Sequence, residues 1–248
     1  MYQFFVEPEQ VDRNDIMITG PDVNHIKNVL RMQVGDEVNV VVNGDDREYR
    51  CKLEAFSDKW VMLKLMFVKQ SNVELPCKVY LFQGLPKSDK MELIIQKTVE
   101  LGVYELIPVA TDRSVVKLDK NKEAARVRRW NAISEAAAKQ SKRAIIPKVR
   151  GLMDFNEAME YCQGMDVRLI PYELSDMDDF SHTRKIIGNI KKDQKVAIFI
   201  GPEGGFSEDE IGLANGCGLI PITLGHRILR TETAGMVVMS WLVYDLEQ

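Results

Sequence analysis

The chain has 248 residues, 45% of them hydrophobic and 28% charged, and carries a formal net charge of −4, which is the composition of an ordinary soluble globular protein. No apolar run approaches the roughly 20 residues of a membrane span, and the acidic N-terminus lacks the apolar core of a secretory signal. The four cysteines are scattered without a C-x-x-C pair, so we expect reduced thiols in a cytoplasmic protein with no metal site.

Short alternating segments dominate residues 3–70 and are typical of a small β-barrel. Ser71-Asn72 and Pro76 then predict a hinge, so we place the end of the first domain at residue 72. The elements predicted before it are a helix at 22–32 and strands at 37–42, 48–55 and 59–68.

Beyond Pro76 strands and helices alternate, which predicts an α/β domain with a mainly parallel sheet. The last helix is apolar nearly all round, so it is either an ordinary core helix or buried in a subunit interface. The predicted strands are 78–85, 105–110, 167–171, 195–200 and 219–224, and the predicted helices are 88–101, 122–140, 154–162 and 232–246.

The charge is distributed unevenly. Between Asp112 and Arg150 there are twelve Lys or Arg and four Asp or Glu, a local charge of +8, so the remainder carries −12. Such a segment is typical of a phosphate-binding face and equally of a solvated helix face. A nucleic-acid partner is therefore compatible with the acidic average.

Two loops follow predicted strands near the C-terminus. The glycine loop, residues 201–206, has the sequence GPEGGF, and the arginine loop, residues 224–230, has the sequence LGHRILR. Ligands bind at the carboxyl ends of neighbouring strands in open α/β sheets, so we expect the two loops to form a binding site there.

The composition of the glycine loop limits what it can bind. Its three glycines let a ligand approach the backbone, and Ser207 with Glu210 predicts a capping box that begins the next helix. The loop lacks the P-loop and dinucleotide spacings, and Glu203 would oppose a phosphate by an energy on the order of several kcal/mol. A cationic or neutral ligand therefore fits better, although a tight turn without a ligand is the alternative.

Arg230 places a permanent positive charge beside this loop. Its guanidinium suits a carboxylate, a phosphate or developing negative charge and cannot act as a general base. The alternative is an ion pair with Glu232 or Glu203 that orders the loop.

Further short segments have the order and spacing of a known protein family, and they extend along nearly the whole chain: 25–31, 34–37, 85–87, 90–92, 96–102, 113–114, 129–130, 135–141, 146–147 and 171–173. Together with the two loops they resemble the SPOUT superfamily of S-adenosylmethionine-dependent RNA methyltransferases. Within it the chain is similar to the small-subunit (16S) ribosomal RNA uridine-N3 methyltransferase family, RsmE. Family members often have proline where this chain has His226.

The resemblance implies a PUA-like β-barrel RNA-binding domain at 1–72 and a SPOUT methyltransferase domain with a C-terminal trefoil knot at 73–248. It also implies a homodimer that methylates N3 of a uridine in 16S ribosomal RNA of the small ribosomal subunit, with S-adenosyl-L-methionine as cofactor. The cofactor-binding residues it implies are Tyr172, Glu173, Gly201, Pro202, Glu203, Gly204, Leu224, Gly225, Ile228, Leu229, Arg230, Thr233 and Ala234.

For catalysis, we expect Arg230 to stabilise the uracil anion or clamp the target base, and Glu232 or Glu173 to take the proton. The residues expected to contact RNA, mainly its phosphates, are His25, Arg31, Lys87, Lys90, Arg113, Arg126, Arg128 and Arg129.

Other functions remain open from the sequence. One is a SPOUT enzyme that modifies transfer RNA at ribose 2′-O or guanine N1, and another is a ribosome-assembly factor that binds RNA without catalysis. A small-molecule enzyme with a nucleotide cofactor is disfavoured because the P-loop and dinucleotide spacings are missing.

Overall fold

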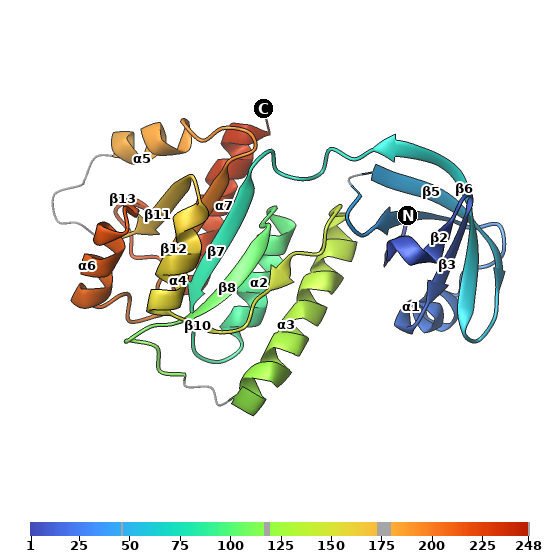
Figure 1. Cartoon of the computed structure of the whole chain (residues 1–248), viewed down its shortest axis with the longest axis horizontal. Helices are drawn as coiled ribbons and strands as arrows, with labels where there is room; N and C mark the ends of the chain where they lie inside the picture. Colours follow the sequence, from blue (N-terminus) through green and yellow to red (C-terminus); the bar gives the residue numbers. More distant parts are fainter. Residues whose placement is uncertain (46, 117–119, 173–179, 248) are drawn as a thin grey trace. The chain divides into compact units, whose positions relative to one another are not determined.

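The computed structural model describes residues 1–45, 47–116, 120–172 and 180–247, and the chain forms two compact units (Figure 1). The first unit comprises residues 1–74 with 138–146, and the second comprises residues 75–137 with 147–248. The segment 138–146 is joined to the first unit by Arg143, which is 3% exposed and whose Nε lies 2.9 Å from Oε1 of Glu74.

The first unit is built on a six-stranded sheet. The strands are antiparallel except for the parallel pair β1 and β4, and their buried aliphatic side chains share one core with Val23 and Ile26. The spatial order is β1 (Gln3–Val6), β4 (Glu37–Val42), β5 (Arg47–Phe56), β6 (Trp60–Gln70), β3 (Asp15–Thr19) and β2 (Val11–Asp12), and a 3₁₀ turn spans Pro8–Gln10.

The helix predicted at 22–32 is shorter in the structure. Helix α1 (Pro21–Asn24) continues as a π-helical turn (His25–Val29), in which the N–H of Leu30 donates to the carbonyl of His25. Arg31 then has a φ of 52°, so the backbone leaves the right-handed helical region at that residue.

The second unit contains a seven-stranded sheet in which every described strand pair is parallel, which confirms the predicted α/β class. The strand predicted at 219–224 covers only three residues. The spatial order is β10 (Met153–Asp154), β8 (Glu105–Ala110), β7 (Lys78–Gly84), β12 (Lys195–Ile200), β11 (Val167–Pro171) and β13 (Ile220–Ile222), with β9 (Lys148–Val149) paired to β8.

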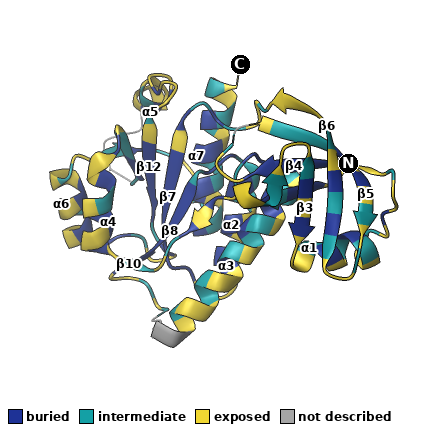
Figure 2. Ribbon diagram, turned by 45° about the vertical axis from the view of Figure 1, so that its right-hand side comes forward, coloured by how far each residue is buried: buried dark blue, intermediate teal, exposed yellow. Residues whose placement is uncertain are grey.

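Helices cover both faces of this sheet, and its central strands are buried (Figure 2). On one face Phe82 and Phe199 stack at 4.2 Å and pack with Phe155. On the other face Gly235 lies against Leu81. The helices are α2 (Lys90–Glu100), α3 (Lys120–Ser141), α4 (Phe155–Tyr161), α5 (Phe180–Ile187), α6 (Glu208–Gly216) and α7 (Thr231–Leu246), and a 3₁₀ turn spans Cys162–Gly164.

Among the residues that the structure describes, the buried positions of helix α7 lie on one side. Val238, Met239 and Leu242 are fully buried, whereas Tyr244 is 75% exposed. A second subunit that covers the exposed side therefore stays a prediction. Helix α5 was not predicted, because its short polar sequence has only Thr183 and Ile187 as buried positions.

Candidate functional site

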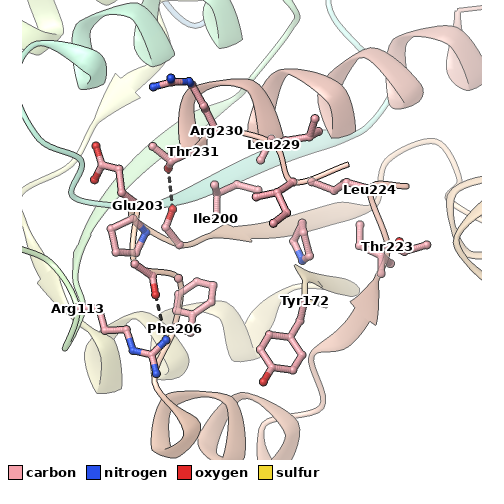
Figure 3. Close-up of a pocket in the computed structure, with 18 of the residues that line it drawn as sticks. Arg113, Tyr172, Ile200, Glu203, Phe206, Thr223, Leu224, Leu229, Arg230 and Thr231 are labelled. Atoms are coloured by element: carbon pink, nitrogen blue, oxygen red, sulfur yellow. Dashed lines mark hydrogen bonds between the residues drawn. The ribbon is translucent and has the colours of Figure 1, made fainter. Parts of the chain in front are cut away.

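A pocket of about 600 Å³ lies at the carboxyl ends of β11, β12 and β13 (Figure 3). The glycine loop and the arginine loop both line it, so the structure brings the two sequence motifs together as expected. The expected cofactor-binding residues that line the pocket are Tyr172, Gly201, Pro202, Glu203, Gly204, Leu224, Gly225, Ile228, Leu229, Arg230 and Ala234. Thr233 and Glu232 are not in the lining, and Glu173 lies outside the described residues.

The backbone of the glycine loop is closely packed at Gly201 and against Gly84 of β7. A Cβ on Gly84, at the end of β7, would lie 2.6 Å from Cδ of Pro202, and one on Gly201 would lie 3.1 Å from Cα of Gly205. Gly205 has a φ of 66°, which favours glycine. The predicted capping box is confirmed, because Ser207 and Glu210 cap each other at the start of α6.

A chain of polar groups joins the two loops beneath the pocket. Nε2 of Gln83, which is fully buried, donates to Oγ1 of Thr231 at 2.9 Å, and this hydroxyl donates to the carbonyl of Gly201 at 2.6 Å. Thr231 is the first residue of α7, so the contact ties the start of that helix to the glycine loop. Sequence reasoning missed both side chains, although a glutamine at the end of an apolar strand is a signal that could have found them.

The loop after β8, whose Arg113 was expected to contact RNA, also contributes to the site. Glu210 is 5% exposed, and its Oε1 accepts a hydrogen bond from the backbone N–H of Asp112 at 2.9 Å. Oγ of Ser207 donates to Oδ2 of Asp112 at 2.7 Å, and Nη1 of Arg113 donates to the carbonyl of Gly204 at 3.0 Å. These contacts fasten the β8 loop to the glycine loop.

Lys90 connects two carboxylates beside the pocket. Its Nζ lies 2.8 Å from Oε1 of Glu203 and 3.4 Å from Oε2 of Glu232. Burial raises the pKa of Glu203, but hydrogen bonds from Lys90 and from backbone N–H groups, including that of Lys87, outweigh it, and the pKa falls below its ordinary value. Glu203 is therefore ionised at neutral pH and forms an ion pair with Lys90.

Arg230 occupies the N-cap position of α7 without a side-chain capping bond and is exposed at the pocket. It forms no ion pair with Glu203 or Glu232, both of which are described and pair with Lys90 instead. The loop-ordering alternative for Arg230 is therefore wrong, and its guanidinium is available to a ligand.

The expected RNA contacts are spread over both units. His25 and Arg31 belong to the first unit, where the ring of His25 meets Phe4 edge to face. In the second unit Lys90 and Arg113 line the pocket, and the backbone N–H of Lys87 donates to Glu203. Arg126, Arg128 and Arg129 lie on α3, and Nε of Arg129 is 2.7 Å from Oε1 of Glu92.

Within the described ranges no helix has both the length and the apolar sequence of a membrane span. The same residues contain no group of three His, Cys, Asp or Glu side chains suited to a metal ion.

Comparison with known proteins gives consistent matches. The RNA methyltransferase domain family matches residues 73–243, and the RNA methyltransferase PUA domain family matches residues 18–61. Ribosomal RNA small subunit methyltransferase E of Bacillus subtilis (strain 168) is 37% identical over 251 residues, which cover 100% of this chain and 98% of the relative. The protein of the same name from Synechocystis sp. is 32% identical, over 99% of this chain and 78% of the relative.

A solved structure is similar over the same length. The ribosomal RNA small subunit methyltransferase E of Neisseria gonorrhoeae, bound to S-adenosyl methionine, superimposes with a TM-score of 0.84 at 27% identity. The match covers 98% of this chain and 97% of that one.

Proposed function

The chain belongs to the ribosomal RNA small subunit methyltransferase E family, and from this membership we propose that it methylates N3 of a uridine in 16S ribosomal RNA of the small ribosomal subunit, with S-adenosyl-L-methionine as methyl donor. The observation that carries the proposal is the pocket at the carboxyl ends of β11, β12 and β13, which both loops line.

The residues present fit this cofactor. The close packing of Gly84 against Pro202 and the turn at Gly205 give a backbone cradle without a phosphate-binding signature. Glu203 is ionised and paired with Lys90, so this lysine is not free to hold a phosphate as a P-loop lysine does. When bound, S-adenosylmethionine supplies a methyl group activated by a sulfonium.

We assign the cofactor to backbone groups of residues 201–204, 224–225 and 228–229, with Thr233 and Ala234 at the start of α7. Tyr172 closes one side, and Glu173, which the resemblance also assigns to the cofactor, lies outside the described residues. The backbone offers donors and acceptors at fixed positions, so the loops recognise the adenine by shape and hydrogen bonding.

The reaction also needs groups that act on the uracil. Loss of the N3 proton leaves a negative charge spread over the neighbouring carbonyl oxygens, and Arg230 stabilises it with a guanidinium that no described carboxylate neutralises. Glu232, whose Oε2 lies 3.4 Å from Nζ of Lys90, is the proposed proton acceptor, with Glu173 as the alternative.

RNA binding is assigned to both domains. Residues 1–72 form the PUA-like RNA-binding domain, and residues 73–248 form the SPOUT methyltransferase domain with its C-terminal knot. His25, Arg31, Lys87, Lys90, Arg126, Arg128 and Arg129 contact the RNA backbone. The exposed side of α7, including Tyr244, packs against a second copy of the chain in a homodimer.

The test is to incubate the protein with methyl-labelled S-adenosylmethionine and small ribosomal subunits that lack native modification, and to identify the labelled nucleoside. Label in 3-methyluridine supports the proposal. Label in a 2′-O-methyl nucleoside or in 1-methylguanosine replaces it with another RNA methyltransferase activity. Cofactor binding without label from any ribosomal or transfer RNA replaces it with an assembly role.

A further inference from the structure

The pocket has two ends of different chemistry (Figure 3). Tyr172, Thr223 and Leu224, none of which is charged, lie at one end. Arg113 and Glu203 lie at the other end. A ligand that combines a flat apolar base with a charged tail therefore has a defined direction in the pocket.

Arg113 is held at the charged end by more than its own contact. The β8 loop that carries it is fastened through Asp112 to the buried carboxylate of Glu210 and to Ser207. Nη1 of Arg113 then donates to the carbonyl of Gly204 at 3.0 Å, and a Cβ on Gly204 would lie only 3.1 Å from Cβ of Arg113. The guanidinium is thus preorganised against the glycine loop.

The guanidinium retains unused donors. It has five N–H groups, and the Gly204 carbonyl takes one of them. Within the described ranges Arg113 has no carboxylate partner, whereas Arg129, Arg143 and Arg150 each pair with a glutamate. An arginine that is held in place and still has unpaired N–H groups can bind a ligand carboxylate through two parallel hydrogen bonds.

We propose that Arg113 binds the carboxylate of the amino-acid end of the cofactor, which directs the adenosine to the uncharged end of the pocket. The inference rests on the proposed function, since it takes S-adenosylmethionine as the ligand. It gives Arg113 a role within the pocket in place of the RNA phosphate contact expected from the sequence.

The test compares two ligands that differ at the amino-acid end. S-adenosylhomocysteine keeps the carboxylate, and 5′-methylthioadenosine keeps the adenosine and thioether but lacks the amino-acid end. Calorimetric titration of both into the wild type, Arg113→Ala and Arg113→Lys measures the contribution of the carboxylate. Arg184→Ala, which removes an exposed arginine of α5 outside the pocket lining, is the matched control.

We expect Arg113→Ala to weaken S-adenosylhomocysteine about 10- to 100-fold and to leave 5′-methylthioadenosine unchanged. Arg113→Lys should recover part of the affinity, because lysine keeps the positive charge but lacks the planar guanidinium. Arg184→Ala should bind both ligands like the wild type. An equal loss for both ligands would overturn the proposal, because Arg113 would then only support the loop.

Two other outcomes also decide the question. If Arg113→Ala binds both nucleosides normally but binds ribosomal RNA more weakly and with a flatter salt dependence, the anion is an RNA phosphate and the proposal is wrong. If the wild type binds neither nucleoside, the proposed function itself fails, and this inference fails with it.

Discussion

Opposite ends of the parallel sheet use similar side chains in different ways. At the amino end of β8, Glu105 is 6% exposed and accepts hydrogen bonds from Nε of Arg150 and from Oη of Tyr161, each at 2.8 Å. We call this cluster the closed end. At the carboxyl ends of β11, β12 and β13, which we call the open end, the lining residues Arg113, Arg227 and Arg230 have no carboxylate partner in the described ranges. An arginine paired within the chain stabilises the fold, whereas one left unpaired at a pocket is available to a ligand.

The largest effect should come from Gly84→Ala at the open end. The new Cβ would lie 2.6 Å from Cδ and 2.7 Å from N of Pro202, so the backbone of the glycine loop must move. A displacement of this kind should weaken S-adenosylhomocysteine by about 100-fold or more, measured by calorimetry. The control is Gly212→Ala on α6, which meets no atom within 4 Å and should bind normally. Unchanged binding to Gly84→Ala would remove the glycine loop from the site.

A substitution at the closed end should lower the stability of the protein and leave its affinity for the nucleoside unchanged. Arg150→Met leaves Glu105 buried with Tyr161 as its remaining donor, and we expect a loss of about 1–3 kcal/mol in the free energy of unfolding, reduced because Arg150 is partly exposed. Urea unfolding measures this, and affinity for S-adenosylhomocysteine should be unchanged.

The matched control for Arg150→Met is Lys64→Met. Lys64 pairs with Asp15 on the surface, with side chains 49% and 47% exposed, and its replacement should leave the free energy of unfolding nearly unchanged. If Arg150→Met weakened the nucleoside as strongly as it lowered stability, the two ends of the sheet would not be independent.

A smaller effect should follow from Thr231→Val, which keeps the shape of the side chain and removes its hydroxyl. Gln83 and Gly201 would each lose a hydrogen bond, so we expect a loss of about 1–2 kcal/mol in stability and a several-fold loss of nucleoside affinity. Thr231→Ser keeps the hydroxyl and should recover most of both. If Thr231→Val kept the stability and the affinity of the wild type, the hydroxyl would have no role in joining the two loops.

The smallest effect concerns pH at the closed end. Burial, with the neighbouring Tyr104, Glu105 and Tyr161, raises the pKa of Tyr80 from 10.0 to about 12. The folded state therefore keeps the proton longer than the unfolded state, and this contribution is complete below pH 10 and declines as the pH rises from 10 towards 12. Urea unfolding across that window should give a shallower decline for Tyr80→Phe, and an identical slope would contradict the assignment.

The parts of the site that were predicted are those that lie in continuous segments. The glycine loop, its capping box and the arginine loop could be identified because each occupies a short stretch after an apolar strand. Gln83 and Asp112 were missed because their contacts with Thr231 and Glu210 span 148 and 98 positions in the sequence. Local patterns carry no information about such distant pairs.

The boundaries of helices were also predicted incompletely from local sequence patterns. The helix predicted at 22–32 follows an apolar pattern, but the left-handed backbone of Arg31 ends the helical conformation before that pattern does. Helix α5 has few apolar positions and forms where Thr183 can exchange hydrogen bonds with the backbone of Thr223.

The sequence by itself determined the α/β class of the second unit, the existence of two loops at strand ends and the family to which the chain belongs, because hydrophobic periodicity and motif spacing are local properties. Only the tertiary structure decided which charged residues are partners and which are available. Lys90 pairs with Glu203 and Glu232, Arg150 pairs with Glu105, and Arg113 faces the pocket. The physical reason is that ion pairs and buried hydrogen bonds form between groups that folding brings within about 3 Å, whatever their separation along the chain.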